Sequence, residues 1–312
     1  MKPTPIKEQL YATMSNDYRD SFWRFMHNKE SSSDAKNLVA GKKADGTYLL
    51  PYKDAAAFAA ALKEQSLFRM IGTVQGVIEN DGVIYVPDSD DLPRWVAEGQ
   101  QVIPSDTDTF SEKYCKAYKL AILTSLGEDF VSDTGFDLQQ YIISRFSKCF
   151  GMAEEDAFIN GTGINMPKGI LHETDGAKTG VTVAEDFTFD DVIHLYFSLD
   201  KRYRRNGCWL MSDETALKLR TLKNQDGLYL WPQSSDTLLG KEVHISEYMP
   251  SDSKPIAFGD FSYYRIIDRQ PLSARILNEL YAMERKIGFI AVERLDGMLT
   301  RPEAVKLLRV GE

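Results

Sequence analysis

The stretch that decides the fold covers residues 136–171 and reads FDLQQYIISRFSKCFGMAEEDAFINGTGINMPKGIL. Its first part carries apolar or small side chains at helical spacing, namely Leu138, Ile142, Phe146, Cys149, Ala153 and Ala157. Because one face of a helix recurs every three or four residues, this spacing predicts a helix over residues 136–160, about 36 Å long. The next residue is Gly161, and glycine is common just after the last residue of a helix. A loop containing Gly and Pro follows.

The residues before this helix predict helices first and strands later. Apolar side chains at helical spacing predict an amphipathic helix over residues 6–27, and Pro51 fits the first turn of a second helix. Between them, Lys29–Lys43 is polar, has three serines in a row and predicts an extended arm or linker. The runs VIYVP and YKLAIL flank an acidic stretch, which predicts a long two-stranded excursion. It has too few core residues to be stable alone, so we expect it to rest on another surface of this chain or of another.

The second half predicts alternating helices and strands. Helical spacing recurs near residues 192–199 and 214–223. The runs CWLMS, EVHIS, IAFGD, YYRIID, LYAMERKIGFIAVERL and AVKLLRV predict strands. The fold class expected from the whole pattern is α+β.

Composition restricts the class of protein. The 312 residues are 43% hydrophobic and 27% charged, as expected of a globular chain with one large or two modest domains. The net charge of −9 argues against wrapping nucleic acid by neutralising its phosphates. The apolar run Ala55–Leu62 is too short to span a bilayer, and the N-terminus does not resemble a secretory signal. Three widely spaced cysteines indicate a reducing compartment, without a disulfide framework.

Motifs for catalysis or metal binding are incomplete. The loop GTGINMPKG lacks the Ser or Thr that must follow the lysine of a phosphate loop, and no G-x-S-x-G elbow occurs. The four histidines include no pair at i, i+4, and the acidic clusters lack the EF-hand glycine. The basic run Arg202–Arg205 could touch phosphate, but it lies at the end of a predicted helix, where cations interact favourably with the dipole. We therefore expect no catalytic residue, metal or cofactor.

Several segments resemble a known family in the order in which they occur. The first half contributes WVAEGQQVIPSDTDTF, TSLGEDFVSD and EEDAFINGTGINMPKGIL. The second half contributes WLMSDETALKLRTLKNQDGLYLWP, LLGKEVHISEYMP, IAFGDFSYYRIIDRQPLSARI and VERLDGMLTRPEAV. Together, over roughly residues 45–310, they resemble the extended loop, spine helix, axial domain and returning strands of tailed-phage major capsid proteins with the Hong Kong 97 fold.

The resemblance implies a domain organisation. It places an N-terminal helix and arm at residues 1–50 and an extended loop at 73–112. A peripheral domain then takes residues 51–72, 113–186 and 286–312, with the spine helix at about 136–160, and an axial domain takes 187–285. Many relatives begin with a cleaved scaffolding segment. Here the resemblance leaves two alternatives, a separate scaffold protein or a processed or trimmed chain.

The function implied is structural rather than enzymatic. The chain would self-assemble as pentamers and hexamers into an icosahedral phage or prophage capsid that encloses double-stranded DNA without sequence-specific binding or membrane contact. The family also implies a portal, a scaffolding protein and a maturation protease as partners, with assembly in the bacterial host cytoplasm. One alternative is an encapsulin-like compartment enclosing an enzyme cargo. Another is a soluble hydrolase that uses the acidic clusters, although no motif fixes an acid and base pair.

Covalent cross-linking of the kind found in the founding member is not expected. There, a loop lysine forms an isopeptide bond with an asparagine of a neighbour, assisted by a glutamate. Aligning VERLDGMLTRPEAV with the founding member without gaps puts Arg285 at the asparagine position and Val292 at the glutamate position. No lysine lies between Arg69 and Lys113.

Assembly contacts are expected on the extended loop. Trp95 is a candidate anchor, with Arg94 and Glu98 beside it, because aromatic residues anchor interfaces and its flanks are polar. Packing within the hairpin is the alternative role for Trp95. Between Asp88 and Glu112 the loop has seven acidic residues against Arg94. It should therefore lie on a basic surface of a neighbour, either the cluster of Arg202, Arg204 and Arg205 or the N-terminal arm.

Overall fold

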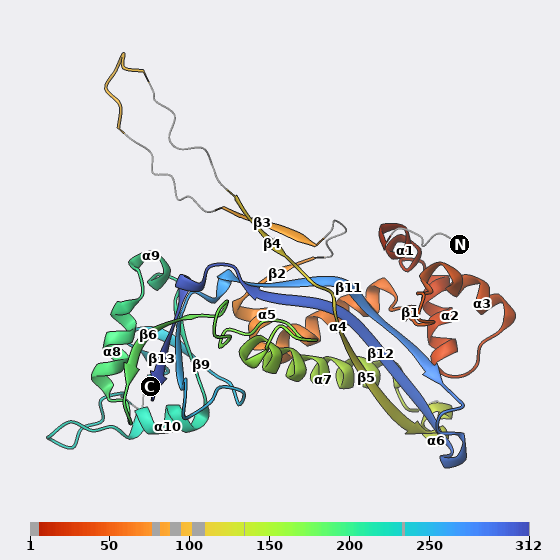
Figure 1. The fold of residues 1–312 in the computed structure, drawn as a ribbon. Helices are drawn as coiled ribbons and strands as arrows, with labels where there is room; N and C mark the ends of the chain where they lie inside the picture. The colour runs from red at the N-terminus through yellow and green to blue at the C-terminus, as the bar shows by residue number, and fades with distance from the viewer. Residues whose placement is uncertain are drawn as a thin grey trace.

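The computed structural model describes residues 6–76, 82–87, 95–101, 110–133, 135–232 and 235–311, and it is α+β as predicted (Figure 1). The helices are α1 (Ile6–Ala12), α2 (Asn16–Met26), α3 (Ser32–Leu38), α4 (Tyr52–Gln65), α5 (Leu67–Ile71), α6 (Glu128–Ser132), α7 (Leu138–Asn160), α8 (Phe189–Ser198), α9 (Lys201–Arg204) and α10 (Asp213–Thr221). The strands are β1 (Tyr48–Leu49), β2 (Thr73–Gln75), β3 (Val83–Pro87), β4 (Phe110–Tyr114), β5 (Tyr118–Gly127), β6 (Lys178–Val183), β7 (Cys208–Met211), β8 (Thr237–Leu238), β9 (Lys241–Ile245), β10 (Ile256–Gly259), β11 (Tyr264–Leu277), β12 (Lys286–Leu299) and β13 (Val305–Val310).

A long five-stranded sheet forms the body of the molecule. Its order is β1-β11-β12-β5, and β2 adds to β11 in parallel. β11 and β12 are antiparallel strands of 14 residues each, and β5 pairs with β12 along its whole length. Helices α4 and α7 lie along this sheet (Figure 1). This long sheet and its helices produce the elongated shape of the molecule.

Helix α7 is the long helix predicted from the sequence. Asp137 caps its first turn by accepting a hydrogen bond from the Gln140 backbone amide, and Gly161 follows its last residue. The buried face is richer in aromatic residues than the predicted stripe: Leu138, Ile142, Phe146, Phe150, Phe158 and Ile159. Ala153, expected on that face, is exposed, because residues 150, 154 and 158 occupy the side that meets the sheet.

The N-terminal region differs from the predicted helix and arm. The helix expected over residues 6–27 is broken into α1 and α2, with Ser15 capping α2. The arm expected at Lys29–Lys43 instead contains α3 and a 3-10 turn at Val39–Gly41. A reciprocal capping box between Ser31 and Asp34 starts α3. Leu38 is fully buried in the same core as residues of α2, α4 and α7, which explains why this segment folds back.

A second, six-stranded sheet has the order β6-β13-β10-β7-β9-β8. Its core is formed by Trp209, Phe258 and neighbouring apolar residues, and α8 and α10 contribute Leu195 and Leu219 to it. Trp209 and Phe258 are paired across β7 and β10, with ring centroids 4.2 Å apart. This sheet and its helices form a separate layer at one end of the molecule (Figure 1).

The membership of the two sheets differs from the expected grouping of residues. β11 lies within the predicted axial range of 187–285, yet it pairs with β12 and β1 in the long sheet. Conversely, β6 and β13 were expected in the peripheral domain, yet they join β10 in the six-stranded sheet. The reason is that the chain crosses between the sheets at the 3-10 turns Phe261–Tyr263 and Pro302–Ala304, not at residues 187 and 285.

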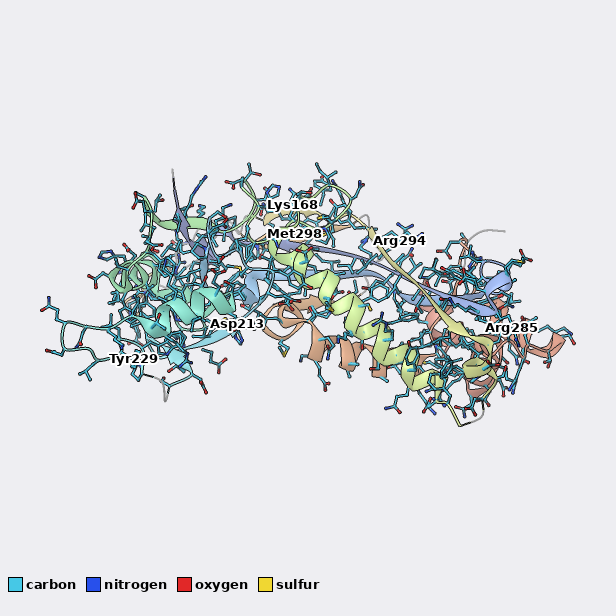
Figure 2. All side chains as sticks on the ribbon, turned by 90° about the horizontal axis from the view of Figure 1, so that it is seen from below. Lys168, Asp213, Tyr229, Arg285, Arg294 and Met298 are labelled. Atoms are coloured by element: carbon cyan, nitrogen blue, oxygen red, sulfur yellow. The ribbon has the colours of Figure 1, made fainter. Side chains whose placement is uncertain are left out.

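Figure 2 gives the positions of residues used below. Tyr229 and Asp213 lie at the end that carries the six-stranded sheet, and Arg285 lies at the opposite end, where β11 turns into β12. Within the described residues, no helix combines the length and the apolar character that crossing a bilayer requires.

Candidate assembly surfaces

The hairpin of β3 and β4 leaves the body of the molecule above the long sheet (Figure 1). The strands are antiparallel, with Tyr85 opposite Glu112 and Pro87 opposite Phe110. Side chains of a strand alternate between its two faces. Ile84 and Val86 face inward and pack with Ile267 and Met298 of the long sheet.

The outer face of this hairpin is aromatic and uncovered. Tyr85, Phe110 and Tyr114 are 59%, 56% and 72% exposed. The Tyr114 hydroxyl donates to Glu112 Oε2 at 3.2 Å, which fixes one ring on this face. We name Tyr85, Phe110 and Tyr114 the outer hairpin face. Large exposed rings on one side of a projecting hairpin are typical of a surface that another chain covers.

The described segment 95–101 lies beyond the hairpin strands (Figure 1), and it contains Trp95 and Glu98. Both are exposed, and the Trp95 side chain is as open as in an extended peptide, at 105%. Arg94 lies outside the described residues, as do Asp88, Asp90, Asp91, Asp106 and Asp108. Within this chain, therefore, the described contacts of the hairpin do not cover Trp95.

The basic cluster lies on α9, a short helix of its own, and not at the end of the preceding helix as predicted. The helical conformation is interrupted between Ser198 and Lys201. The Asp200 carboxylate caps α9 by accepting a hydrogen bond from the Arg202 backbone amide, and it also pairs with Arg202 Nε at 3.3 Å. Arg204 donates to the Leu199 carbonyl at 2.9 Å. Its guanidinium also lies over the rings of Tyr196 and Phe197. Arg202 and Arg204 are thus held in place by their own chain.

Arg205 differs from its neighbours because it is exposed and forms no ion pair within the described part of the chain. It borders a groove of about 380 Å³ that Lys241 and His244 also line. Glu242 and Asp260 lie in the same groove. Burial lowers the pKa of His244 below its ordinary value, against the opposing effect of Glu242. The positive charge at this groove therefore comes from Arg205 and Lys241.

The turn between β11 and β12 is a second exposed apolar surface. Leu280 is 57% exposed and Met283 is 100% exposed, and Arg285 ends the turn in the left-handed conformation with φ of 53°. Phe130 of α6 is also exposed, and the backbone amide of Glu128 donates to the Arg285 carbonyl at 3.1 Å. Sequence patterns did not single out Leu280 or Met283, since an exposed turn has no periodic signal.

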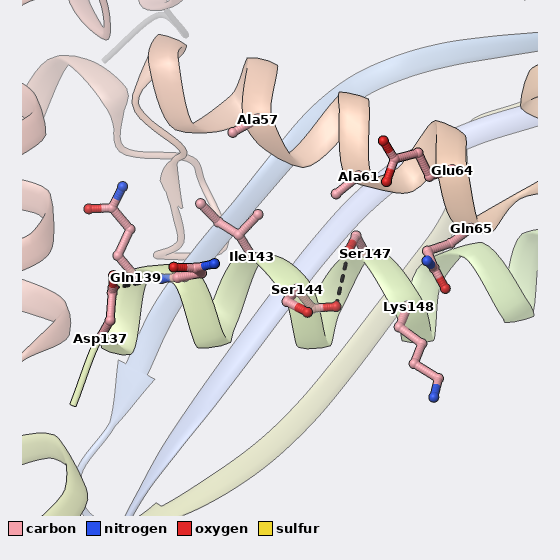
Figure 3. A pocket seen from close by; sticks show the side chains of 11 residues that line it. Ala57, Ala61, Glu64, Gln65, Asp137, Gln139, Ile143, Ser144, Ser147 and Lys148 are labelled. Carbon is pink, nitrogen blue, oxygen red and sulfur yellow. Dashed lines mark hydrogen bonds between the residues drawn. The ribbon is translucent and has the colours of Figure 1, made fainter.

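Figure 3 shows a groove of about 520 Å³ between α4 and α7. Short side chains such as Ala57, Ala61 and Ser144 line part of it, and longer polar ones such as Glu64 and Lys148 line the rest. The helices meet closely at one end, where Gly151 faces Gln65; a Cβ there would lie 2.8 Å from the Gln65 Cβ. In the part of the chain that the structure describes, no group of three His, Cys, Asp or Glu residues is arranged to hold a metal ion. The groove therefore reflects helix packing.

The positions relevant to cross-linking fall on two different elements. Arg285 lies in the exposed turn, and Val292 is buried in β12, paired with Ser273 and Ala121 of the adjacent strands. A guanidinium provides no carboxamide, and an isopropyl group accepts no proton. Neither side chain has the chemistry that isopeptide formation requires at these positions.

Comparison with known proteins agrees with this geometry. The model of the phage capsid family matches residues 46–310. The capsid of an empty GTA particle, computed with C5 symmetry, is 28% identical with a TM-score of 0.67, covering 80% of this chain and 90% of that chain. The capsid of the native GTA particle gives 28% identity, a TM-score of 0.63 and coverage of 78% and 90%. A protein of Microbacterium phage Oxtober96 shares the fold at 16% identity and a TM-score of 0.56, covering 90% and 99%.

No curated protein matches this chain. The family match and the capsid structures favour a phage capsid protein over the encapsulin-like compartment. The match extends from the segment before β1 to the last strand and includes both sheets, the hairpin and α7. The chain belongs to the phage capsid family, as a major capsid protein with the Hong Kong 97 fold.

Proposed function

We propose that the chain forms rings of five and of six copies that close into an icosahedral shell around double-stranded DNA, without sequence-specific binding. The observation that carries this proposal is the outer hairpin face, an aromatic surface on a projecting hairpin that its own chain leaves uncovered. A surface that contacts a different surface on the next copy makes a head-to-tail contact. Such contacts generate rings when the rotation closes.

The contacts proposed for the ring are apolar at the hairpin and polar around it. Tyr85, Phe110 and Trp95 provide aromatic anchors, and Arg94 and Glu98 provide polar flanks. The acidic loop lies against α9 of a neighbour, where Arg205 offers a guanidinium that pairs with no carboxylate of the described residues. Arg202 and Arg204 extend the same positive surface. Individual surface ion pairs contribute about 0–1 kcal/mol each. The charges therefore orient the loop, while the aromatic side chains supply most of the affinity.

The domain roles follow from the sheets. We propose that the long sheet with α4 and α7 is the peripheral domain and that the six-stranded sheet with α8 and α10 is the axial domain. Residues 73–112 are the extended loop. A portal, a scaffolding protein and a maturation protease act with the shell during assembly in the bacterial host cytoplasm. The protein itself works as a structural subunit and not as an enzyme.

The shell is held without isopeptide bonds. The chemistry at Arg285 and Val292 and the absence of lysine between Arg69 and Lys113 support this proposal. The net charge of −9 also suits a container for DNA, since a wall that bound phosphates strongly would oppose packaging and release.

The test is assembly of a variant that loses two of the three rings of the outer hairpin face, Tyr85→Ser with Phe110→Ser. Both side chains are exposed, so the fold of the subunit should be unaffected. The matched control is Tyr11→Ser, which removes a ring that is 71% exposed on α1. Analytical ultracentrifugation should show large assemblies for the wild type and the control, and smaller species for the double variant. Equal assembly of all three would contradict the proposed role of the hairpin.

A further inference from the structure

A buried cluster of charged groups joins α5, α7 and the long sheet. Arg69 of α5, Glu154 of α7 and Glu293 of β12 are 8%, 1% and 5% exposed. Asp268 of β11 completes the cluster at the edge, where its side chain is 30% exposed. β11 has register irregularities on both sides of Gln270, immediately after Asp268. The cluster therefore lies where the long sheet bends.

The guanidinium of Arg69 donates four hydrogen bonds to two of the three carboxylates. Its Nε donates to Glu154 Oε2 at 2.7 Å and its Nη2 to Glu154 Oε1 at 2.5 Å. On its other side, Nη1 and Nη2 donate to the two carboxylate oxygens of Asp268, at 3.2 and 3.0 Å. Such two-pronged pairs are the strongest geometry available to arginine and carboxylate. Among the described residues, no hydrogen bond joins Arg69 to Glu293.

Glu293 forms no ion pair among the described residues, although the charge of Arg69 acts on it and opposes the effect of burial. Its Oε1 is buried and has no hydrogen-bond partner within the described part of the chain, and the nearby carboxylate of Glu154 raises its pKa. The other cation that acts here is Lys43, but its Nζ donates to the Pro271 carbonyl and to Ser273 Oγ, at 3.1 and 3.0 Å. On the adjacent strand β5, the residue opposite Glu293 is the apolar Leu120. Arg294, next in sequence, donates to the Ala117 carbonyl instead.

Counting charges shows why a proton is needed. Three ionised carboxylates around one guanidinium would leave an excess of negative charge, and one of the carboxylates would be buried and unpaired. An uncompensated buried charge is strongly unfavourable, so such a group binds a proton instead. Burial raises the pKa of Glu293 well above its ordinary value, and the neighbouring charge of Glu154 acts in the same direction.

We propose that Glu154 and Glu293 together hold one proton at neutral pH, and that this proton stabilises the packing of α5 and α7 against the long sheet. The inference concerns the folded subunit and is independent of the proposed assembly. Loss of the proton places two negative charges side by side, which favours separation of α7 from β12. Arg69 connects this event to the loop, because β2 and the extended loop begin four residues after it.

The sign of the pH dependence follows from linkage. A carboxyl group whose pKa is raised on folding contributes stability that is present at low pH and is lost as pH rises towards the folded pKa. The packing of α5 and α7 against the long sheet should therefore weaken at alkaline pH, whereas surface ion pairs of carboxylates weaken at acid pH. Amide hydrogen exchange across α5 and β2, corrected for its intrinsic pH dependence, should accelerate at alkaline pH in the wild type but not in Glu293→Gln.

Infrared spectroscopy tests for the proton directly, because the C=O stretch of a protonated carboxylic acid is separate from the stretches of carboxylates. The wild type at neutral pH should show this band, and Glu293→Gln should lose it. Glu185→Gln is the matched control, because it removes an exposed carboxylate and should keep the band. Absence of the band from the wild type would overturn the proposal.

Two further measurements identify the origin of the band. Asp296 is a buried carboxylate whose pKa is also raised by burial, although two backbone amides donate to it. A band that survives in Glu293→Gln and disappears in Asp296→Asn would therefore overturn the assignment. Labelling the side-chain carboxyl carbon of glutamate with ¹³C makes the test independent of any variant's folding. The band should shift in the labelled wild type, and an unshifted band would refute the shared proton.

Discussion

Replacing Asp54 by alanine should detach the N-terminal helices from the body of the subunit. Asp54 is 2% exposed at the start of α4, and its carboxylate accepts hydrogen bonds from α2 and α7. Arg19 donates through Nε and Nη2 at 3.0 Å, Trp23 through Nε1 at 2.8 Å and Gln139 through Nε2 at 2.8 Å. One carboxylate thus ties together three helices.

The expected loss comes mainly from the buried donors. Arg19 is one-third exposed, so its ion pair contributes about 0–1 kcal/mol after screening by solvent. Trp23 is 8% exposed, and a buried donor left unsatisfied costs about 1–3 kcal/mol. Gln139 is partly exposed and can bond to water instead, which makes its loss about 0.5–1 kcal/mol. Together, Asp54→Ala should lower the free energy of unfolding by about 1.5–5 kcal/mol.

The assay is chemical unfolding of unassembled subunits, followed by tryptophan fluorescence and circular dichroism. Asp54→Asn keeps an acceptor for one of the donors and should lose less than the alanine variant. Asp20→Ala removes an exposed carboxylate from α2 and should stay within about 0.5 kcal/mol of the wild type. If Asp54→Ala is as stable as Asp20→Ala, the carboxylate does not join these helices and the reasoning is wrong.

Three further predictions concern the assembled protein. Boiling in detergent should return a single band at the 35.3 kDa monomer mass, and a ladder that survives reduction would contradict the absence of isopeptide bonds. Trp95→Ala should lower the yield of assemblies, whereas an unchanged yield would show that Trp95 does not anchor a contact between copies. Lowering the pH towards 4, or adding salt, should weaken sedimenting assemblies before circular dichroism changes; simultaneous loss would show that the contacts are mainly apolar. Arg24 holds the pKa of Asp34 well below its ordinary value of 3.8, so docking of α3 should survive this acid step and weaken only at lower pH.

Periodicity predicted the elements that bury a continuous apolar face. The spacing through Leu138, Ile142 and Phe146 located α7, and alternation in VIYVP and YKLAIL located β3 and β5. The same alternation in VIYVP and FSEKY could have identified Tyr85 and Phe110 as one exposed face. These signals are local, and the final structure preserves them.

Features that depend on distant partners were not predictable from one sequence. α3 has a local signal in the Ser31 and Asp34 capping box, but it lacks an apolar stripe of its own, and Asp34 is buried through its pair with Arg24 on another helix. β11 and β10 are both apolar strands separated by one short turn, so nothing local assigns them to different sheets. Arg69 and Glu154 meet across 85 residues, and charged side chains with no spacing rule give no signal of such a contact.

Electron microscopy of the purified 312-residue chain in negative stain tests the central claim most directly. The protein should form closed shells, or rings of five and six copies, because the outer hairpin face requires a neighbour to cover it. Rings alone would still be consistent with a capsid subunit that needs a partner to close. Particles that remain monomeric at high concentration, confirmed by light scattering on the same sample, would contradict assembly as the function of this chain.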